Sequence, residues 1–130
     1  MEQQSTPWFL RGNWAPTQQE HTTTSLKVEG SIPPELNGVY LRTGPNPASG
    51  NGDHWFLGDG MVHGIRLQNG RAEWYRNRFI QTPDITDPLS DPMGGIGDLR
   101  RGKGNTHVMA HNKKSFVLKK HIGPGLLMTN

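Results

Sequence analysis

The chain has 130 residues, of which 32% are hydrophobic, 17 are glycine and 10 are proline. This length allows one domain with a modest core, and the many turn-forming residues favour an all-β or irregular fold over long helices. The absence of cysteine excludes disulfides, thiolate zinc sites and cysteine nucleophiles. The net charge of +3 comes from basic and acidic residues that are mixed along the chain, which indicates a solvated surface and no nucleic-acid partner.

The first 24 residues show no hydrophobic periodicity, so we expect an extended lead-in before one larger unit over residues 25–130. Three aromatic residues lie close together within the lead-in, namely Trp8, Phe9 and Trp14. Disordered tails rarely contain so many aromatics. We therefore expect these side chains to anchor the lead-in to a larger body.

Residues 1–7 lack the basic and apolar stretches of a signal sequence, and no apolar run in the chain approaches membrane-spanning length. We therefore expect a soluble, cytoplasmic protein without a membrane span. Peripheral contact with a membrane stays open.

Two short strands are expected before the middle of the chain. Leu26 to Glu29 is one candidate, and the apolar run Val39 to Leu41 is the other. A turn-rich segment precedes the second run and Pro45 follows it closely, so this run is too short for a helix.

The clearest β-hairpin pairs Met61 to Leu67 with Arg71 to Gln81. The Asn69-Gly70 pair between the two arms accepts positive φ at both positions, as a tight hairpin turn requires. Because side chains alternate along a strand, we expect one face of the second arm to carry three of them, Tyr75, Asn77 and Phe79.

Residues Pro83 to Gly104 are expected to form a loop that is unusually long for a compact domain. A second hairpin follows, with arms at Thr106 to His111 and Ser115 to Lys119 and a turn at Asn112 to Lys114. Two successive hairpins are typical of a propeller, and equally of any meander.

Histidine is the natural metal ligand in a chain without cysteine, and there are six candidates: His21, His54, His63, His107, His111 and His121. No pair has helical spacing on a credible helix. His107 and His111 fall on an expected strand, where they would lie about 13 Å apart, too far to bind one ion together. Structural roles are therefore the favoured interpretation.

Six aspartates supply the carboxylates for acid and base chemistry, namely Asp53, Asp59, Asp84, Asp87, Asp91 and Asp98. A glycosidase-like pair is one interpretation, and solvated loop residues are the favoured one. The turn Gly58-Asp59-Gly60 lacks the lysine and hydroxyl residue of a phosphate-binding loop.

Four blocks of this sequence resemble the carotenoid oxygenase family. The first runs from Gly30 to Pro47 and contains Arg42-Thr43-Gly44-Pro45-Asn46-Pro47, which is similar to the family motif R-x-G-P-N-P. The others are His54 to Ile65, Tyr75 to Thr82 and Asn105 to His111.

The resemblance implies a seven-bladed β-propeller with Fe(II) on its axis, held by four histidines from different blades. Members of the family are several times longer than this chain. We therefore expect an all-β, N-terminal part of the propeller that ends before the first iron histidine and holds no metal by itself. His63 is expected to support the fold.

Two substrate-binding residues are implied by the lignostilbene-cleaving branch of the family. Phe56 is similar to a phenylalanine that packs against the substrate, with a core aromatic as the alternative. Lys119 is similar to a lysine that contacts the phenolic hydroxyl, with an ordinary surface lysine as the alternative. The following residue departs from the pattern, because the family has a glutamate that hydrogen-bonds an iron histidine where this chain has Lys120.

The expected function is that of a fragment of an Fe(II) dioxygenase, which uses O₂ to cleave an apolar alkene such as a carotenoid, apocarotenoid or stilbene. By itself the chain is expected to be inactive. The alternative is a small non-catalytic β module that binds an apolar ligand or a protein partner.

Overall fold

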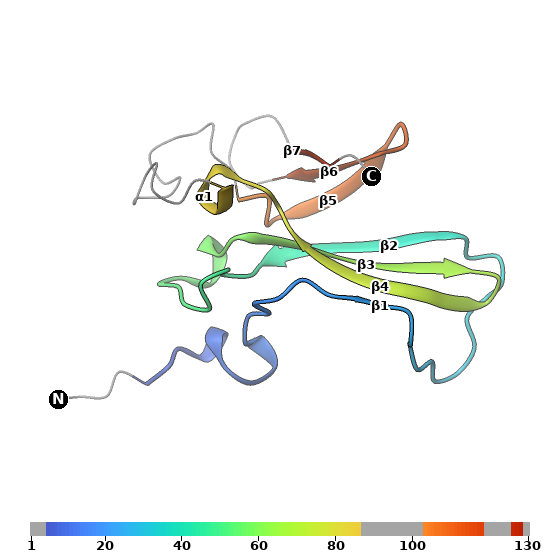
Figure 1. The fold of residues 1–130 in the computed structure, drawn as a ribbon, viewed down its shortest axis with the longest axis horizontal. Coiled ribbons are helices and arrows are strands. Elements are labelled where there is room, and N and C mark those ends of the chain that lie inside the picture. Colours follow the sequence, from blue (N-terminus) through green and yellow to red (C-terminus); the bar gives the residue numbers. More distant parts are fainter. Residues whose placement is uncertain (1–4, 87–102, 119–125, 129–130) are drawn as a thin grey trace.

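The computed structural model describes residues 5–86, 103–118 and 126–128, which form two antiparallel sheets (Figure 1). The first sheet has the strand order β1-β4-β3-β2, with β1 at Thr22–Thr23, β2 at Gly38–Pro45, β3 at Gly60–Gln68 and β4 at Arg71–Phe79. The second has the order β5-β6-β7, with β5 at His107–His111, β6 at Lys114–Leu118 and β7 at Leu126–Met128. The prediction of a sheet protein is confirmed.

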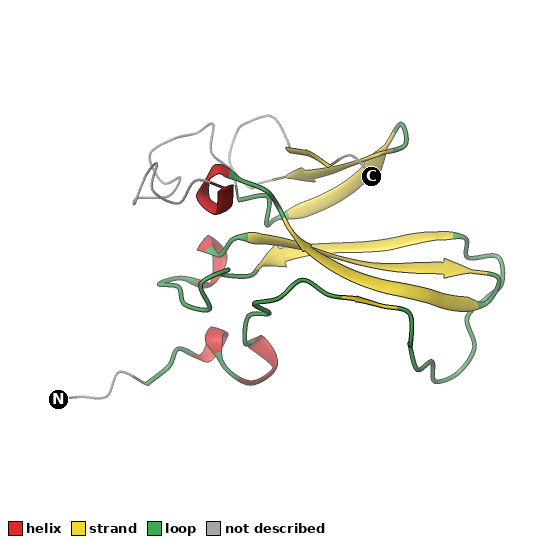
Figure 2. Cartoon of the chain, in the orientation of Figure 1, coloured by secondary structure: helices red, strands yellow, loops and turns green. Residues whose placement is uncertain are grey.

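Helical structure in the described residues is limited to single turns. These are η1 at Trp8–Leu10, η2 at Gly12–Trp14, η3 at Trp55–Leu57 and α1 at Pro83–Thr86. Figure 2 shows them all toward the same end of the four-stranded sheet. None of them is long or apolar enough to cross a membrane.

Both predicted hairpins are confirmed, and each turns on two residues with positive φ. Asn69 and Gly70 have φ of 51° and 73°, and Asn112 and Lys113 have φ of 48° and 59°. Such turns match the twist of the strands that they connect. The second turn is one residue shorter than expected, because Lys114 already pairs with His111.

The hairpin of β3 and β4 contains one irregularity near its turn. Arg66 pairs with Trp74 while Leu67 pairs with Ala72. Glu73 is therefore an extra residue on β4 and forms a β-bulge.

Two predictions about the first strands need correction. The strand predicted at Val39 to Leu41 runs on to Pro45, which pairs with Gly60. Proline is tolerated there because β2 is an edge strand and needs no donor on its outer side. The strand predicted at Leu26 to Glu29 was wrong, since Thr22–Thr23 pairs with β4 instead.

The buried apolar core lies where the two sheets meet. Val62, Ile80 and Val117 are buried there, and Leu41 and Val108 pack against them. The hydroxyl of Thr43 donates to the carbonyl of Gly104 at 3.0 Å. Backbone passes so close at this junction that a Cβ on Gly60 would lie 2.2 Å from the carbonyl oxygen of Lys103. Only glycine fits at residue 60, which fixes how closely the second sheet approaches the first.

The N-terminal segment, residues 5–23, is attached to the four-stranded sheet through Asn77, which is fully buried. The Asn77 side chain accepts from the backbone N–H of His21 and donates to the carbonyl of Gln19 at 3.2 Å. Its amide also lies 3.4 Å from the Met61 sulfur. Figure 1 shows this segment passing along β4 before the chain reaches β2.

Asn46 holds the same segment at a second point. Its amide donates to the carbonyl of Thr17 at 2.6 Å and accepts from the Thr17 N–H at 2.8 Å. Its own N–H donates to the carbonyl of Asp59 at 2.6 Å. Asn46 therefore joins the N-terminal segment to the loop that precedes β3.

Replacing Asn77 by alanine should lower the free energy of unfolding by about 2 kcal/mol, because partners of the buried amide on the N-terminal segment lose their hydrogen bonds. Urea denaturation measures the change. Asn51→Ala, at an exposed loop position, is the matched control and should lie within about 0.5 kcal/mol of the wild type. Equal stability of the two variants would contradict the role of Asn77 in attaching the N-terminal segment.

Candidate functional site

The described residues contain an exposed aromatic cluster, which we define as Trp8, Phe9, Trp14, Trp55 and Phe56. Trp55 is at its centre: its ring lies 5.1 Å from Trp8 and 5.6 Å from Trp14, both in edge contacts. On its other side Trp55 stacks on Phe56 at 5.0 Å with an interplanar angle of 28°. The lead-in aromatics thus contact the body of the protein, as predicted.

Phe56 is 63% exposed and Trp55 is 37% exposed. The structure therefore does not place Phe56 in the core formed by the described residues. Trp8 and Trp14 are also exposed, as is Leu57, which follows Phe56 in the sequence. Contiguous apolar surface of this kind marks binding sites more often than isolated exposed residues do.

The short helix η3 carries Trp55 and Phe56 and is held at both ends. The imidazole Nδ1 of His54 accepts from the Phe56 N–H at 3.2 Å, which caps the helix. From the start of the second sheet, the Asn105 amide donates to the carbonyls of Phe56 at 3.0 Å and Gly58 at 2.7 Å. The backbone of Phe56 is thereby fixed although its ring is exposed.

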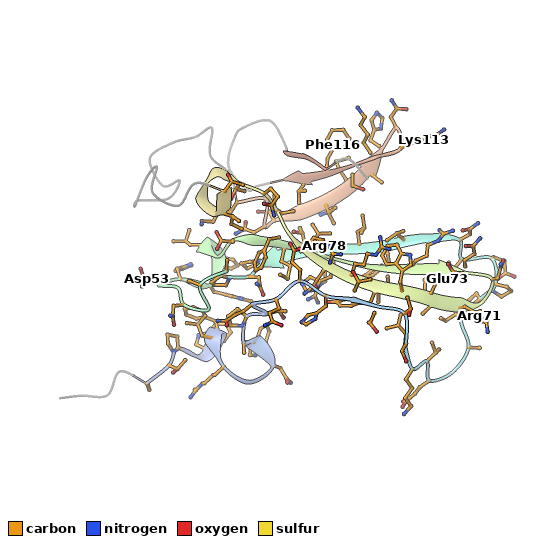
Figure 3. All side chains as sticks on the ribbon, viewed as in Figure 1. Asp53, Arg71, Glu73, Arg78, Lys113 and Phe116 are labelled. Atoms are coloured by element: carbon orange, nitrogen blue, oxygen red, sulfur yellow. The ribbon has the colours of Figure 1, made fainter. Side chains whose placement is uncertain are left out.

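Asp59 follows η3 and has a structural role. One carboxylate oxygen lies 2.8 Å from the Lys103 ammonium, and the other accepts from the Ala48 N–H at 2.9 Å. Both oxygens are occupied, which argues against Asp59 as a catalytic acid or base. Asp53 is exposed on the loop before η3 (Figure 3). The side chains of the other four candidate aspartates lie outside the described residues.

A second group of polar residues lies on the four-stranded sheet. The imidazole Nδ1 of His63 is 2.8 Å from the Tyr75 hydroxyl. Burial lowers the pKa of His63, and the nearby Arg42 guanidinium lowers it further. Burial raises the pKa of the Tyr75 phenol, and Arg42 opposes that rise. Both groups are thus neutral at pH 7, and the contact between them ties β3 to β4.

Tyr75 and Asn77 share one face of β4, as predicted. Tyr75 reaches His63 and Asn77 reaches Met61, and these two partners lie two residues apart on the same face of β3. This face therefore joins the hairpin to the N-terminal segment through Asn77.

No group of three or more histidine, cysteine or carboxylate residues that could hold a metal ion occurs in the part of the chain that the structure describes. His63 contacts Tyr75, while His107 and His111 are exposed on β5. His121, Lys119 and Lys120 lie outside the described residues. Of the two predicted substrate-binding residues, only Phe56 therefore has a described position.

Residues 14–125 match the family described as retinal pigment epithelial membrane protein. The chain belongs to this family. Curated relatives include a carotenoid cleavage oxygenase of Mycobacterium tuberculosis, 42% identical over 117 residues. A carotenoid 9,10(9',10')-cleavage dioxygenase 1 of Phaseolus vulgaris is 46% identical over 128 residues, and a lignostilbene-alpha,beta-dioxygenase isozyme III of Sphingomonas paucimobilis is 32% identical over 136.

Solved structures of family members share the fold. The lignostilbene dioxygenase of Pseudomonas brassicacearum has 25% sequence identity and a TM-score of 0.67, with 88% of this chain and 28% of that chain covered. Cobalt-substituted apocarotenoid oxygenase of Synechocystis has 27% identity and a TM-score of 0.66, with 81% and 26% covered. Matches to the curated relatives cover 85%, 93% and 92% of this chain, in the order given above. The chain spans 23% to 27% of those relatives' own lengths.

The sequence predicted a substrate-binding role for Phe56, but it did not predict the residues that hold Phe56 in place. Trp55 was not predicted as a site residue, although it precedes Phe56 in the block that resembles the family and contacts both Trp8 and Trp14. The roles of Asn46 and Asn77 in attaching the N-terminal segment were not predicted either. The position of a polar residue between Tyr75 and Phe79 on one predicted face of the strand was the available signal for Asn77.

The lowered pKa of His63 predicts acid sensitivity. The unfolded chain binds a proton more readily than the folded one, so stability is full above the ordinary histidine value of 6.5 and falls as the pH drops below it toward the lower folded value. His63→Gln should reduce the loss of unfolding free energy between neutral and mildly acid pH. Denaturant titrations at both pH values measure it, with His107→Gln as the control for removing an imidazole. An unchanged acid loss in His63→Gln would contradict the assignment.

Proposed function

We propose that the chain is the N-terminal portion of an Fe(II) dioxygenase that cleaves the double bond of a carotenoid, apocarotenoid or stilbene with O₂. Family membership supports this, together with relatives that are named as carotenoid and lignostilbene oxygenases. In this proposal residues 1–24 are a lead-in, and residues 25–130 are the first part of a seven-bladed propeller. A cytoplasmic location and peripheral membrane contact stay predictions.

The observation that carries the proposal for this chain is the exposed ring of Phe56. Its backbone is fixed by Asn105 while one face of its ring stacks on Trp55. An apolar alkene conjugated to an aromatic ring can stack in the same way on such a surface. Phe56 would therefore bind and orient the substrate and exclude water from one side of it.

Iron is not assigned to any residue that the structure describes. Those residues provide no group of metal ligands, so they do not fit an Fe(II) site by themselves. One solved relative has been crystallised in a cobalt-substituted form. In the proposed enzyme Fe(II) supplies the O₂ chemistry, and this portion supplies part of the apolar surface around the substrate.

Lys119 is proposed to contact a phenolic hydroxyl of the substrate, as the family resemblance implies. An ammonium beside a phenol lowers the pKa of that phenol and favours the phenolate, which donates electrons into the alkene. Lys120 is proposed to weaken an iron site, because an ammonium cannot accept a hydrogen bond from an imidazole N–H.

The second candidate function is a non-catalytic module that binds an apolar ligand or a protein partner. The exposed aromatic cluster favours it, since this surface exists without any metal. The two functions share ligand binding at Phe56 and differ in the need for iron.

The purified chain should take up substoichiometric iron after anaerobic incubation with Fe(II), and it should not cleave trans-4-hydroxystilbene or an apocarotenal. The reason is that its described residues offer no cluster of ligands. Metal analysis and chromatographic detection of aldehyde products measure the two quantities. Stoichiometric iron with aldehyde formation by these 130 residues would overturn the proposal that the iron site requires more of the enzyme.

Phe56→Ala should weaken binding of trans-4-hydroxystilbene to the chain by roughly fivefold, because a stacking contact contributes about 1 kcal/mol. Anisotropy of the stilbene's own fluorescence measures the dissociation constant. Tyr40→Ala is the matched control, since Tyr40 has nearly the same exposure, 61%, but pairs with Ile65 away from η3. Equal weakening by both substitutions would argue for non-specific adsorption.

A further inference from the structure

We propose that Trp55 is a positioning residue for Phe56, and that Trp8 and Trp14 of the N-terminal segment hold Trp55 in place. The proposal rests on the proposed role of Phe56 as a substrate contact. In this proposal the N-terminal segment helps to form the apolar site, through the contacts of Trp8 and Trp14 with Trp55.

The ring contacts follow one order from the N-terminal segment to Phe56. Trp8 and Trp14 meet each other edge-on at 5.7 Å, and each meets Trp55 edge-on. The three indoles thus form a closed triangle, and edge-to-face geometry of this kind is favourable for aromatic pairs. Phe56 contacts Trp55 and the His54 ring at 5.6 Å. Trp55 is therefore the link between the N-terminal segment and the exposed ring.

The rings of the cluster differ in exposure. Among Trp8, Trp14, Trp55 and Phe56, Phe56 is the most exposed at 63%, and Trp55 is the least exposed at 37%. An exposed aromatic side chain changes rotamer rapidly, and a ligand that binds it must stop that motion. A neighbour that is itself held on two sides restricts Phe56 beforehand. The cluster therefore preorganises the ring that is open to a ligand.

Both halves of the cluster are attached to one residue, Asn46. The Asn46 side chain binds Thr17, which follows Trp14 closely, and the Asn46 N–H binds Asp59, which follows η3 closely. The indoles of the N-terminal segment are thereby kept near Trp55 at high effective concentration. Glu20 adds a further attachment by accepting from the Phe79 N–H at 2.9 Å.

A double-mutant cycle on the full chain tests the proposal, with trans-4-hydroxystilbene as the probe. Trp8→Ala should raise the dissociation constant about threefold although Trp8 has no ring contact with Phe56, and this effect should vanish in the Phe56→Ala background. Trp55→Ala should raise it about tenfold, and Trp55→Phe, which keeps a ring, should restore most of the affinity. Asn13→Ala is the control from the same segment, since Asn13 is exposed and lies outside the aromatic cluster, and it should leave the dissociation constant unchanged.

Circular dichroism reports the cluster independently of ligand binding, because close indole pairs give an exciton-coupled signal. Trp8→Ala should weaken this signal and leave the urea midpoint near that of the wild type, since Trp8 is 49% exposed. Loss of the signal with an unchanged dissociation constant would overturn the positioning role. So would a Trp8 effect of the same size with and without Phe56, which would indicate direct contact with the ligand.

The failure of the proposed function has a different signature. If the wild-type chain does not bind the stilbene, or if Phe56→Ala binds it as well as the wild type does, then the role of Phe56 is wrong and positioning falls with it. If Phe56→Ala weakens binding and Trp8→Ala does not, only the positioning role is wrong.

Discussion

Two buried amides dictate how this molecule is assembled. Asn46 and Asn77 point away from water, and a buried amide without partners costs on the order of 1–3 kcal/mol. Their partners include backbone groups of residues 17–21, so the sheet satisfies its buried polar groups only when the N-terminal segment lies along β4. The segment is therefore an integral part of the sheet, and the position of every aromatic residue that it carries follows from these bonds.

The aromatic site inherits its geometry from this attachment. η3 is held from the second sheet by Asn105 and from the N-terminal segment by the indoles that meet Trp55. Two parts of the chain that are distant from η3 in sequence thus converge on this short helix. These contacts give a site with exposed rings a defined shape although no large core lies beneath it. The orientation of Phe56 depends on them, so family membership alone does not predict it.

The sequence predicts local structure correctly where a single turn, or the alternation of side chains along one strand, determines it. Asn69-Gly70 specifies a two-residue turn, and the alternation of β4 correctly placed Tyr75 with Asn77. The strand at Thr22–Thr23 could not be predicted from its own sequence, because its partner β4 lies far along the chain and is connected to this segment by Asn77. The strand predicted at Val39 to Leu41 was too short, because Pro45 is tolerated in β2 only at the edge of the sheet, and the order of the strands is known only from the assembled sheet. The contacts of Trp55 are likewise a property of the fold.

The β-bulge at Glu73 affects the tendency of the molecule to associate with other copies of itself. Within the described residues β1 pairs only with Tyr75 and Arg76, so the outer edge of β4 from Arg71 to Trp74 has no strand beside it. An open edge is a template for another strand, and in a crowded solution it invites edge-to-edge aggregation. The bulge breaks the regular spacing of hydrogen-bonding groups along that stretch, and it does so at an exposed, charged residue (Figure 3). A local irregularity in one strand thereby makes this edge of the sheet a poorer template for a second copy of the chain.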